Sequence, residues 1–324
     1  MRPDGILPPM GTHGRDNVRH LLSSADLSGE EFSFLLEVAA ALKAKPQRLL
    51  EGRQLALVFE KPSLRTRVSF QVGMRHLGGE TIYLGPQEVG LGEREPIKDV
   101  ARALSRYVHI VAVRTFEQEI IEEYARYSSV PVINALTIAE HPCQALADLL
   151  TLKEKWGALN GRSIAFVGDG NNVAASLVLT AASLGMDVRI ASPRGYMLPE
   201  AVVSEASVRA EQSGGRLAFV VDPAEAVAGA DAVYTDVWAS MGQEREFERR
   251  RIDFNGYQLN AALVSGAAAD ALIMHDLPAH RGDEITDEVI ESDRSIIFDQ
   301  AENRVWAQAA VVAFLLGQAD RVTT

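Results

Sequence analysis

One segment well suited to binding an anion is formed by Ser63, Leu64, Arg65, Thr66 and Arg67. It follows an apolar run and precedes a helical pattern. Serine is a good helix N-cap, and the free amides of the first helical turn attract an anion. Two arginines and two hydroxyls add charged and neutral donors. Because residues i and i+2 point to different sides of a helix, we expect only one arginine to reach the anion. A capped helix with solvated arginines is the alternative interpretation of such a short segment.

A second group of residues could polarise a carbonyl. His141 and Gln144 stand at the start of a long helical pattern, and Arg114 ends an apolar run. A single histidine at a helix start is more often a capping or surface residue than a catalyst. Downstream of an anion-binding segment, however, the three side chains together favour a set of donors directed at a carbonyl group.

A glycine-rich segment at residues 168–172 follows another apolar run and starts a helical pattern, which suggests a dinucleotide site. The dinucleotide fingerprint needs a further glycine at position 173, where this chain has Val173. The next apolar run ends at Ala191 and is followed by no acidic residue that could hold a ribose. These two departures disfavour a nicotinamide-dependent oxidoreductase.

The composition is that of a globular protein with two domains. The chain has 324 residues, of which 47% are hydrophobic and 23% charged, and this length exceeds what one core usually needs. The formal net charge of −12 disfavours nucleic acid or an anionic membrane as a partner. The single cysteine, Cys143, precludes an intramolecular disulfide. No apolar run reaches membrane-spanning length and the N-terminus lacks a signal-peptide core, so we expect a cytoplasmic protein.

Short β-branched runs alternate with amphipathic stretches, and this alternation predicts α/β units with parallel sheets. The predicted strands are residues 54–59, 81–84, 109–113, 131–134, 163–167, 187–191, 217–221, 232–235, 271–274 and 295–298. The predicted helices include residues 68–76, 97–107, 118–127, 141–156 and 176–184.

The alternation occurs twice along the chain. We therefore expect two doubly wound parallel-sheet domains joined by interdomain helices, with residues 1–150 in the first and residues 151–302 in the second. A last helix, from about residue 303 to 318, is expected to pack back on the first domain. In such folds ligands lie at the carboxyl ends of the strands, which is where the candidate residues fall.

Three further strings complete a family resemblance. Residues 236–242 are Asp-Val-Trp-Ala-Ser-Met-Gly, residues 275–282 are His-Asp-Leu-Pro-Ala-His-Arg-Gly, and residues 301–304 are Ala-Glu-Asn-Arg. Together with Ser-Leu-Arg-Thr-Arg and His-Pro-Cys-Gln, they resemble the motifs of the aspartate and ornithine carbamoyltransferases. The string with Ser-Met-Gly resembles the loop that distinguishes the ornithine enzymes. The resemblance runs from about Leu55 to the C-terminus.

The resemblance implies that the carbamoyl group of carbamoyl phosphate is transferred to the δ-amine of ornithine, giving citrulline and phosphate without a metal or cofactor. The implied carbamoyl-phosphate contacts are Ser63, Leu64 (through its amide), Arg65, Thr66, Arg114, His141, Gln144, Leu277 and Arg304. The implied ornithine contacts are Asn172, Asp236, Ser240 and Met241. The implied catalytic residues are Arg65, Arg114, His141 and Asp276. The family also implies a homo-oligomer, either a trimer or a multiple of trimers.

Two residues depart from the family pattern. Asp276 stands where the family usually has cysteine, beside the expected position of the δ-nitrogen. A carboxylate there would favour the unreactive ammonium form, or it could accept the proton lost during attack. We expect the second, with activity retained and the pH optimum moved. Gly90 stands where many members carry a glutamine or histidine that reaches a neighbouring subunit's site, so the chain lacks that side-chain contact.

Two alternative functions stay open. A sister transferase could act on putrescine, acetylornithine or aspartate, although the Ser-Met-Gly loop with Asp236 favours a free α-amino acid. A non-catalytic relative could keep the fold and bind carbamoyl phosphate without turnover, which the departures at Asp276 and Gly90 would fit.

Overall fold

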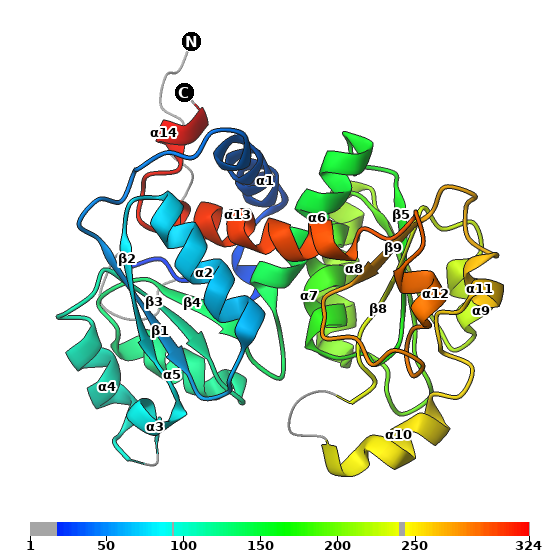
Figure 1. Cartoon of the computed structure of the whole chain (residues 1–324), viewed down its shortest axis with the longest axis horizontal. Coiled ribbons are helices and arrows are strands. Elements are labelled where there is room, and N and C mark those ends of the chain that lie inside the picture. Colours follow the sequence, from blue (N-terminus) through cyan, green and yellow to red (C-terminus); the bar gives the residue numbers. More distant parts are fainter. Residues whose placement is uncertain (1–17, 93, 240–243, 324) are drawn as a thin grey trace.

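The computed structural model of the chain describes residues 18–92, 94–239 and 244–323, and its strands form two parallel sheets (Figure 1). The first sheet has the order β2 (Glu80–Leu84), β1 (Gln54–Phe59), β3 (Ile110–Arg114) and β4 (Val132–Leu136). The second has the order β7 (Arg216–Val220), β6 (Asp187–Ala191), β5 (Ser163–Val167), β8 (Ala232–Thr235) and β9 (Leu272–His275). The predicted fold class of two doubly wound parallel-sheet domains is confirmed.

The strands form where apolar, β-branched residues run without alternation. Every position of β3 and of β5 is buried, and so are five of the six positions of β1. A strand that is buried on both faces needs a layer of helices on each side of its sheet, which right-handed strand–helix–strand connections provide.

Helices before and within the first sheet are η1 (Ser24–Asp26), α1 (Gly29–Ala44), α2 (Leu64–His76), α3 (Pro86–Val89), α4 (Ile97–Leu104) and α5 (Gln118–Tyr127). Helix α6 (Pro142–Trp156) leads to the second sheet. The helices that follow are α7 (Asn172–Ser183), α8 (Glu200–Ser213), α9 (Pro223–Val227), η2 (Glu244–Glu246), α10 (Phe247–Asp253), α11 (Ala261–Val264), α12 (Asp287–Ile290), α13 (Ile297–Leu315) and α14 (Asp320–Thr323). None of the described helices is long and apolar enough to cross a membrane.

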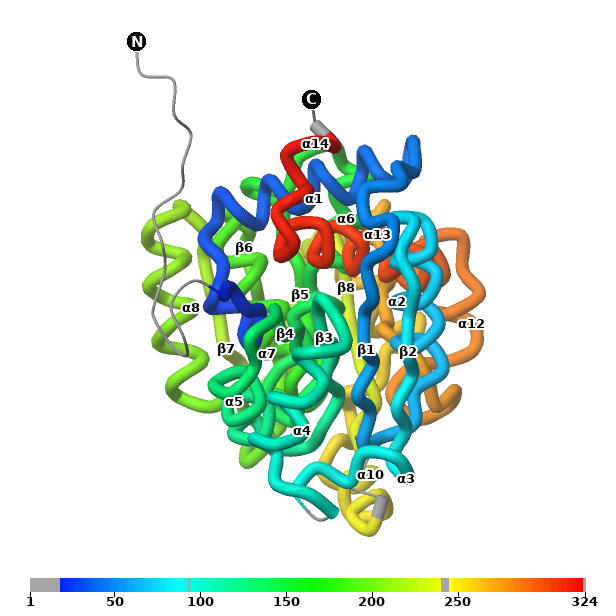
Figure 2. Tube along the Cα trace, turned by 90° about the vertical axis from the view of Figure 1, so that its left-hand side faces the viewer, coloured from blue at the N-terminus to red at the C-terminus, as the bar shows by residue number. Residues whose placement is uncertain are grey.

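Two helices connect the halves of the molecule. Every residue of α6 from Pro142 to Leu152 is buried, so this helix is enclosed on all sides. Helix α13 starts beside β9 and packs against α6, α2 and α1. In Figure 1 it crosses from the second sheet to the first, and Figure 2 shows it next to α1 and α2. Side chains on α13 can therefore reach a site between the sheets.

The predicted strand at residues 295–298 is wrong, and so is the predicted start of the last helix at residue 303. Ser295 makes only an isolated bridge to Ile273, and α13 begins at Ile297. The buried Ile296 and Ile297 have the composition of a strand. They nevertheless turn into the helix, whose first backbone bond runs from the Gln300 amide to the Ile296 carbonyl at 2.9 Å, because the next turns bury Asn303, Arg304 and Trp306.

Candidate active site

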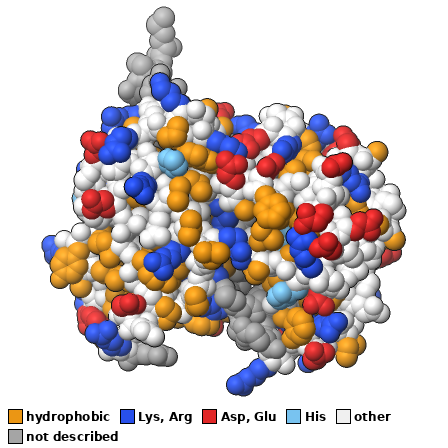
Figure 3. All heavy atoms as spheres, viewed as in Figure 1, with side chains coloured by type: hydrophobic (Ala, Val, Ile, Leu, Met, Phe, Trp, Pro, Cys, Tyr) orange, Lys and Arg blue, Asp and Glu red, His pale blue; other side chains and the backbone are white. Residues whose placement is uncertain are grey.

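A cleft of about 870 Å³ lies between the two sheets. Its lining comes from the loops after β1, β3, β4, β5, β6, β8 and β9, with the first turns of α2 and α7, one residue of α10 and one residue of α13. The space-filling view shows a hollow between the two halves with basic side chains gathered along it (Figure 3). The cleft thus occupies the carboxyl ends of both parallel sheets, where ligands of doubly wound folds bind.

Three arginines from distant parts of the chain meet on one wall of the cleft. Arg65 belongs to the first turn of α2, Arg114 ends β3 and Arg304 lies on α13. The hydroxyl of the fully buried Thr66 accepts from Arg114 Nη1 at 3.2 Å and from Arg304 Nη2 at 2.6 Å. One threonine thereby holds two guanidinium groups in place, and we call Arg65, Arg114 and Arg304 the cationic wall.

The cationic wall carries buried donors that have no protein acceptor. Burial, followed by the charge of Arg304, lowers the pKa of Arg114 to about 9. Burial also lowers the pKa of Arg304, and it holds the pKa of His141 well below its usual value, assisted by both arginines. Within the described residues, Nε of Arg114, Nε of Arg304 and Nδ1 of His141 have no hydrogen-bond partner. Unsatisfied buried donors beside concentrated positive charge favour an anionic ligand.

The start of α2 adds backbone donors to the same wall. The Ser63 hydroxyl caps the helix by accepting from the Thr66 amide at 3.3 Å, which leaves the amides before it free for a ligand. Arg65 lines the cleft, whereas the exposed Arg67 lies with its guanidinium carbon 3.7 Å from the centre of the Tyr83 ring. The two arginines lie on different sides of the helix, and only Arg65 is positioned for a ligand in the cleft.

His141 is positioned by a chain of hydrogen bonds behind it. Its amide donates to Ser176 Oγ at 2.8 Å, and the Ser176 hydroxyl donates to Glu140 Oε2 at 2.9 Å. The same Glu140 oxygen accepts from the Ser24 amide at 2.8 Å. Segments before α1, before α6 and within α7 therefore converge on the turn that presents this histidine to the cleft.

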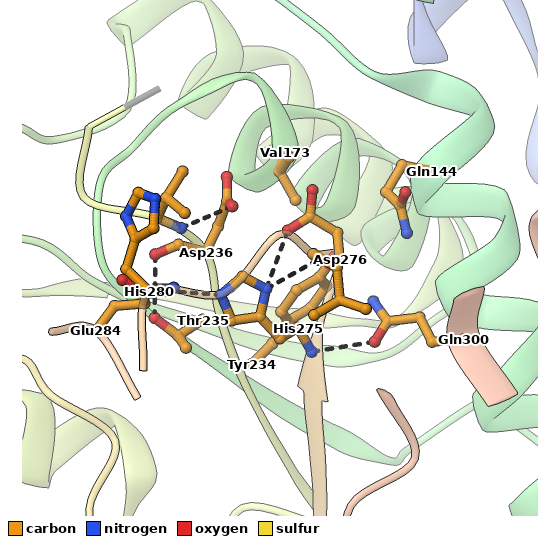
Figure 4. Close-up of polar contacts among 12 residues, drawn as sticks. Gln144, Val173, Tyr234, Thr235, Asp236, His275, Asp276, His280, Glu284 and Gln300 are labelled. Atoms are coloured by element: carbon orange, nitrogen blue, oxygen red, sulfur yellow. Dashed lines mark hydrogen bonds and ion pairs between the residues drawn. The ribbon is translucent and has the colours of Figure 1, made fainter. Parts of the chain in front are cut away.

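Two aspartates form the opposite wall, which we call the anionic wall. β8 and β9 are parallel neighbours in which Thr235 pairs with His275, so the next residues, Asp236 and Asp276, follow two adjacent strand ends. In the close-up both side chains rise on the same side as Val173, at the start of α7 (Figure 4). Neighbouring parallel strands lie about 4.8 Å apart, and the register alone brings the two carboxyl groups together.

Asp236 is held by its neighbours more firmly than Asp276. Asp236 Oδ1 accepts from the Val237 amide at 2.7 Å, and Oδ2 accepts from Asn171 Nδ2 at 2.7 Å. Asn171 also caps α7 with its side-chain oxygen. The following residue, Asn172, donates from Nδ2 to the Thr137 carbonyl at 2.6 Å and lines the cleft.

A buried histidine sets the backbone after β9. The Leu277 amide donates to His275 Nδ1 at 2.9 Å, and the other ring nitrogen of His275 lies 3.1 Å from Glu284 Oε1. Leu277 has φ 61°, a left-handed conformation that a branched residue adopts only when its surroundings hold it there. This turn exposes residues 276 and 277 to the cleft.

Gln144 lies behind the cleft and does not line it. Its Nε2 donates to Asp148 Oδ1 at 2.8 Å, while its buried Oε1 has no partner among the described residues. Asp148 also accepts from Gln300 Nε2 at 2.7 Å and from the Tyr234 hydroxyl at 3.1 Å. Burial raises the pKa of Asp148 to about 7 against these hydrogen bonds.

Comparison with known proteins identifies the family and supports the fold. The family model for the carbamoyl-P binding domain of aspartate/ornithine carbamoyltransferases matches residues 19–154, and the model for the Asp/Orn binding domain of the same family matches residues 160–315. The chain belongs to the aspartate/ornithine carbamoyltransferase family.

Individual carbamoyltransferases are similar over almost the whole chain. An ornithine carbamoyltransferase of Parasynechococcus marenigrum is 53% identical over 300 residues, covering 92% of this chain and 94% of the relative. An anabolic ornithine carbamoyltransferase of Pyrococcus furiosus is 50% identical over 304 residues, covering 92% and 96%. A solved ornithine carbamoyltransferase structure from Pyrococcus furiosus has a TM-score of 0.90 at 50% identity, covering 92% of this chain and 97% of that one.

Most of the residues predicted from the carbamoyltransferase resemblance line this one cleft. They are Ser63, Leu64, Arg65, Thr66, Arg114, His141, Asn172, Asp236, Asp276, Leu277 and Arg304. Gln144 is the exception among the described residues. Ser240 and Met241 lie outside the described residues, so their predicted contacts stay predictions.

Several residues of the carbamoyltransferase cleft were missed in the sequence. Arg250 Nη1 contacts Asp169 Oδ2 at 2.6 Å and the Trp238 carbonyl at 2.7 Å, and both charged residues line the cleft. Lys61 lines it too, with Nζ 3.7 Å from the centre of the Phe116 ring. Arg250 stands in a charged stretch typical of a solvated helix, so no signal marks it. Lys61 adjoins the anion-binding segment, and its position could have been noticed.

Proposed function

We propose that this chain transfers the carbamoyl group of carbamoyl phosphate to the δ-amine of ornithine, giving citrulline and phosphate. The observation that carries the proposal is the separation of charge in the cleft, with Arg65, Arg114 and Arg304 in the cationic wall and Asp236 and Asp276 in the anionic wall. A phosphate ester and an amino acid with a cationic amine are complementary to those walls. The similarity to anabolic ornithine carbamoyltransferases supports the direction toward citrulline.

Carbamoyl phosphate binds on the cationic wall in this proposal. Its phosphate accepts hydrogen bonds from the Ser63 hydroxyl, the Leu64 amide, the Arg65 guanidinium and Thr66. Its carbonyl oxygen accepts hydrogen bonds from Arg114, His141 and Arg304. The buried, neutral His141 can donate to that oxygen without adding another buried charge. Its amide nitrogen donates to the Leu277 carbonyl. Gln144 lies behind the cleft, so its predicted contact with this nitrogen stays a prediction. The support is the set of buried donors that lack protein partners.

Ornithine binds on the anionic wall. Its α-ammonium pairs with Asp236, and its α-carboxylate is held by Ser240 and the Met241 amide, with Asn172 alongside. The δ-nitrogen then points toward Asp276 and the carbamoyl carbon. The support for this arrangement is that the two aspartates and Asn172 line the cleft from the second sheet, whereas Arg65 and Arg114 line it from the first.

The reaction needs no nucleophile from the protein. The neutral δ-amine attacks the carbamoyl carbon, and negative charge develops on the carbonyl oxygen beside Arg114, His141 and Arg304. Preorganised donors at such a position stabilise the transition state, and each typically contributes about 10²–10³-fold to turnover. The carbon–oxygen bond then breaks, and phosphate leaves with the electron pair on the wall that bound it.

The test is product formation by purified protein given carbamoyl phosphate with ornithine, putrescine, acetylornithine or aspartate in turn. We expect citrulline from ornithine and at most traces of product from the other amines. Preferred turnover of another amine would replace ornithine by that substrate. Tight binding of carbamoyl phosphate without any turnover would make the chain a non-catalytic relative.

A homo-oligomer is part of the same proposal. Leu64, Val68 and Val72 form an exposed apolar stripe along α2, and Ile82 is exposed on the neighbouring edge strand β2. Such a stripe beside a sheet edge supports an interface between copies of the chain. Gly90 ends α3 in the left-handed conformation, with φ 49°. It has no side chain that could reach a neighbouring subunit's site. The mass of the purified chain in solution tests for the expected trimer or multiple of trimers. The cytoplasm remains the proposed compartment.

A further inference from the structure

The two carboxyl groups of the anionic wall share one small space. Oxygen atoms of Asp236 and Asp276, together with a ring nitrogen of His275, lie within 4.8 Å of one another. Asp236 is 5% exposed, and the Asp276 side chain is 11% exposed. Two carboxyl groups this close in a largely dry site do not both ionise readily, so the pair retains a proton in the empty cleft.

The hydrogen bonds decide which carboxyl group holds that proton. Asp236 accepts two N–H groups, from Val237 and Asn171, so both of its oxygen atoms already act as hydrogen-bond acceptors. Asp276 Oδ1 has no hydrogen-bond partner among the described residues. The nearest ring nitrogen, His275 Nδ1, lies 3.6 Å away and already accepts from the Leu277 amide, so it has no proton to offer. The proton therefore resides on Asp276.

The charged surroundings of Asp276 lead to the same assignment. The titratable groups that face it are Asp236 and Tyr234 of the β8 end, Asp148 of α6, His275 of β9, Arg114 of β3 and Arg304 of α13. Burial raises the pKa of Asp276 well above the ordinary carboxyl value, and the charges of Asp236 and Asp148 act in the same direction, opposed by Arg304.

We propose that the α-ammonium of ornithine, on pairing with Asp236, expels the proton from Asp276, so that Asp276 becomes a proton acceptor only in the loaded cleft. The inference rests on the proposed function. The ammonium neutralises the charge next to Asp276, which is the main electrostatic reason beyond burial for that carboxyl group to stay protonated. Carbamoyl phosphate, in contrast, favours the protonated form of Asp276, because its negative charge offsets the positive charges of Arg304 and Arg114. The proton consequently leaves when the amino acid arrives.

This switch closes the proton balance of the reaction. The δ-amine forms a bond to the carbamoyl carbon and becomes positively charged, and its proton moves to the carboxylate of Asp276. The bond from carbon to the phosphate oxygen breaks, the oxygen keeps the electron pair, and phosphate takes up a proton in solution. Citrulline departs with its α-ammonium, and Asp236 is again an unpaired charge beside a protonated Asp276. The resting state is thereby regenerated.

The direct test counts protons on binding. L-norvaline has the α-ammonium and α-carboxylate of ornithine but no δ-amine, so it loads the site without reacting. Calorimetric titration of norvaline into protein with carbamoyl phosphate, in two buffers of different ionisation enthalpy near about pH 6.5, gives the number of protons released. This pH lies well above the ordinary carboxyl pKa. We expect about one proton per site from the unaltered chain and none from Asp276→Asn. The matched control Asp287→Asn removes an exposed carboxylate of α12 and should release the same proton as the unaltered chain.

Kinetics give a second, independent readout. Asp276→Asn should lower kcat by about 10²–10⁴-fold, the usual contribution of a general base. Asp276→Cys should recover part of the rate and move the acidic limb of the kcat profile toward the thiol pKa of about 8.5. An unchanged profile in Asp276→Cys, or equal proton release by the unaltered chain and Asp276→Asn, overturns the switch. Failure of the unaltered chain to make citrulline would instead overturn the proposed function.

Discussion

The two walls of the cleft are built in different ways. The cationic wall is assembled from α2, β3 and α13, whose contributing residues lie up to 239 positions apart (304 − 65), and Thr66 ties two of its arginines together. The anionic wall needs only two adjacent strands and one pairing register. The geometry of the cationic wall depends on the packing of distant segments against one another. The geometry of the anionic wall depends only on the pairing register of two neighbouring strands. Phosphate binding should therefore be more sensitive to packing than amino-acid binding.

The walls also differ in how their charges are satisfied before any ligand arrives. Arg114 and Arg304 are buried with unpartnered Nε atoms, and burying such donors is unfavourable until a ligand accepts from them. Asp236 by contrast already accepts two hydrogen bonds. In the empty cleft, the cationic wall has hydrogen-bond donors without acceptors, and the anionic wall holds a proton between its two carboxyl groups. Substitutions on each wall should accordingly affect different kinetic parameters.

The largest expected effect is on the cationic wall. Arg65→Ala should lower kcat/KM for carbamoyl phosphate by about 10³-fold, because it removes a charged donor from the phosphate and the developing transition state. The matched control is Arg67→Ala on the same helix, which removes only an exposed contact with Tyr83. We expect the control to change kcat/KM by less than about threefold, consistent with an exposed cation–π contact. Steady-state kinetics with varied carbamoyl phosphate give kcat/KM for both variants. Comparable losses in the two would contradict the assignment of Arg65, and not Arg67, to the cationic wall.

Asp236→Asn tests the anionic wall. It should raise the KM for ornithine by about 10²-fold, since truncating one side of a desolvated charge pair typically weakens binding by about 2–5 kcal/mol. The affinity for carbamoyl phosphate should stay within about twofold, because the arginines are untouched. Asp253→Asn, in an ion pair at the surface of α10, is the matched control. Equal loss of both substrates in Asp236→Asn would mean that the walls do not act separately.

Much of this contrast could be predicted from the sequence. Local signals placed Ser63 at a helix start, Arg114 at a strand end and Asp236 after a buried strand, and parallel sheets bring such positions to one edge. The resemblance of these motifs to those of carbamoyltransferases then implied the two substrates. The ten predicted strands included all nine strands of the described residues. Those that are buried, such as β1, β3 and β5, are continuous apolar runs.

What could not be predicted depends on packing between distant segments. The Ile296–Ile297 pair resembles a strand locally, and only the burial of the next turns makes it the start of α13. Nothing in the sequence shows that Thr66 bridges two arginines, or that Arg250 turns inward to Asp169. The adjacency of Asp236 and Asp276 also needs the strand order, which places β8 next to β9. Sequence patterns carry local conformation, and these contacts are tertiary.

The smallest expected effect concerns the residue that lies behind both walls. Asp148 accepts hydrogen bonds from Gln144 of its own helix α6, from Tyr234 of β8 and from Gln300 of α13. Its pKa is raised to about 7 in the folded chain, against about 3.9 in an unfolded one. Between these values the folded chain holds a proton that the unfolded chain has lost. This contribution to stability is thus complete below about pH 4 and disappears as the pH rises through 7, at up to about 1.4 kcal/mol per pH unit.

Asp148→Asn should remove that contribution to the pH dependence without abolishing folding. Urea unfolding at a series of pH values should show a flatter stability profile between about pH 4 and 7 in the variant than in the unaltered chain. The exposed carboxylate variant Asp287→Asn should keep the original slope. Identical slopes in Asp148→Asn and the unaltered chain would mean that Asp148 is already ionised near pH 4, its three donors having outweighed burial. Gln144 of α6, Tyr234 of β8 and Gln300 of α13 would then be joined by an anionic carboxylate rather than by one that becomes protonated below neutral pH.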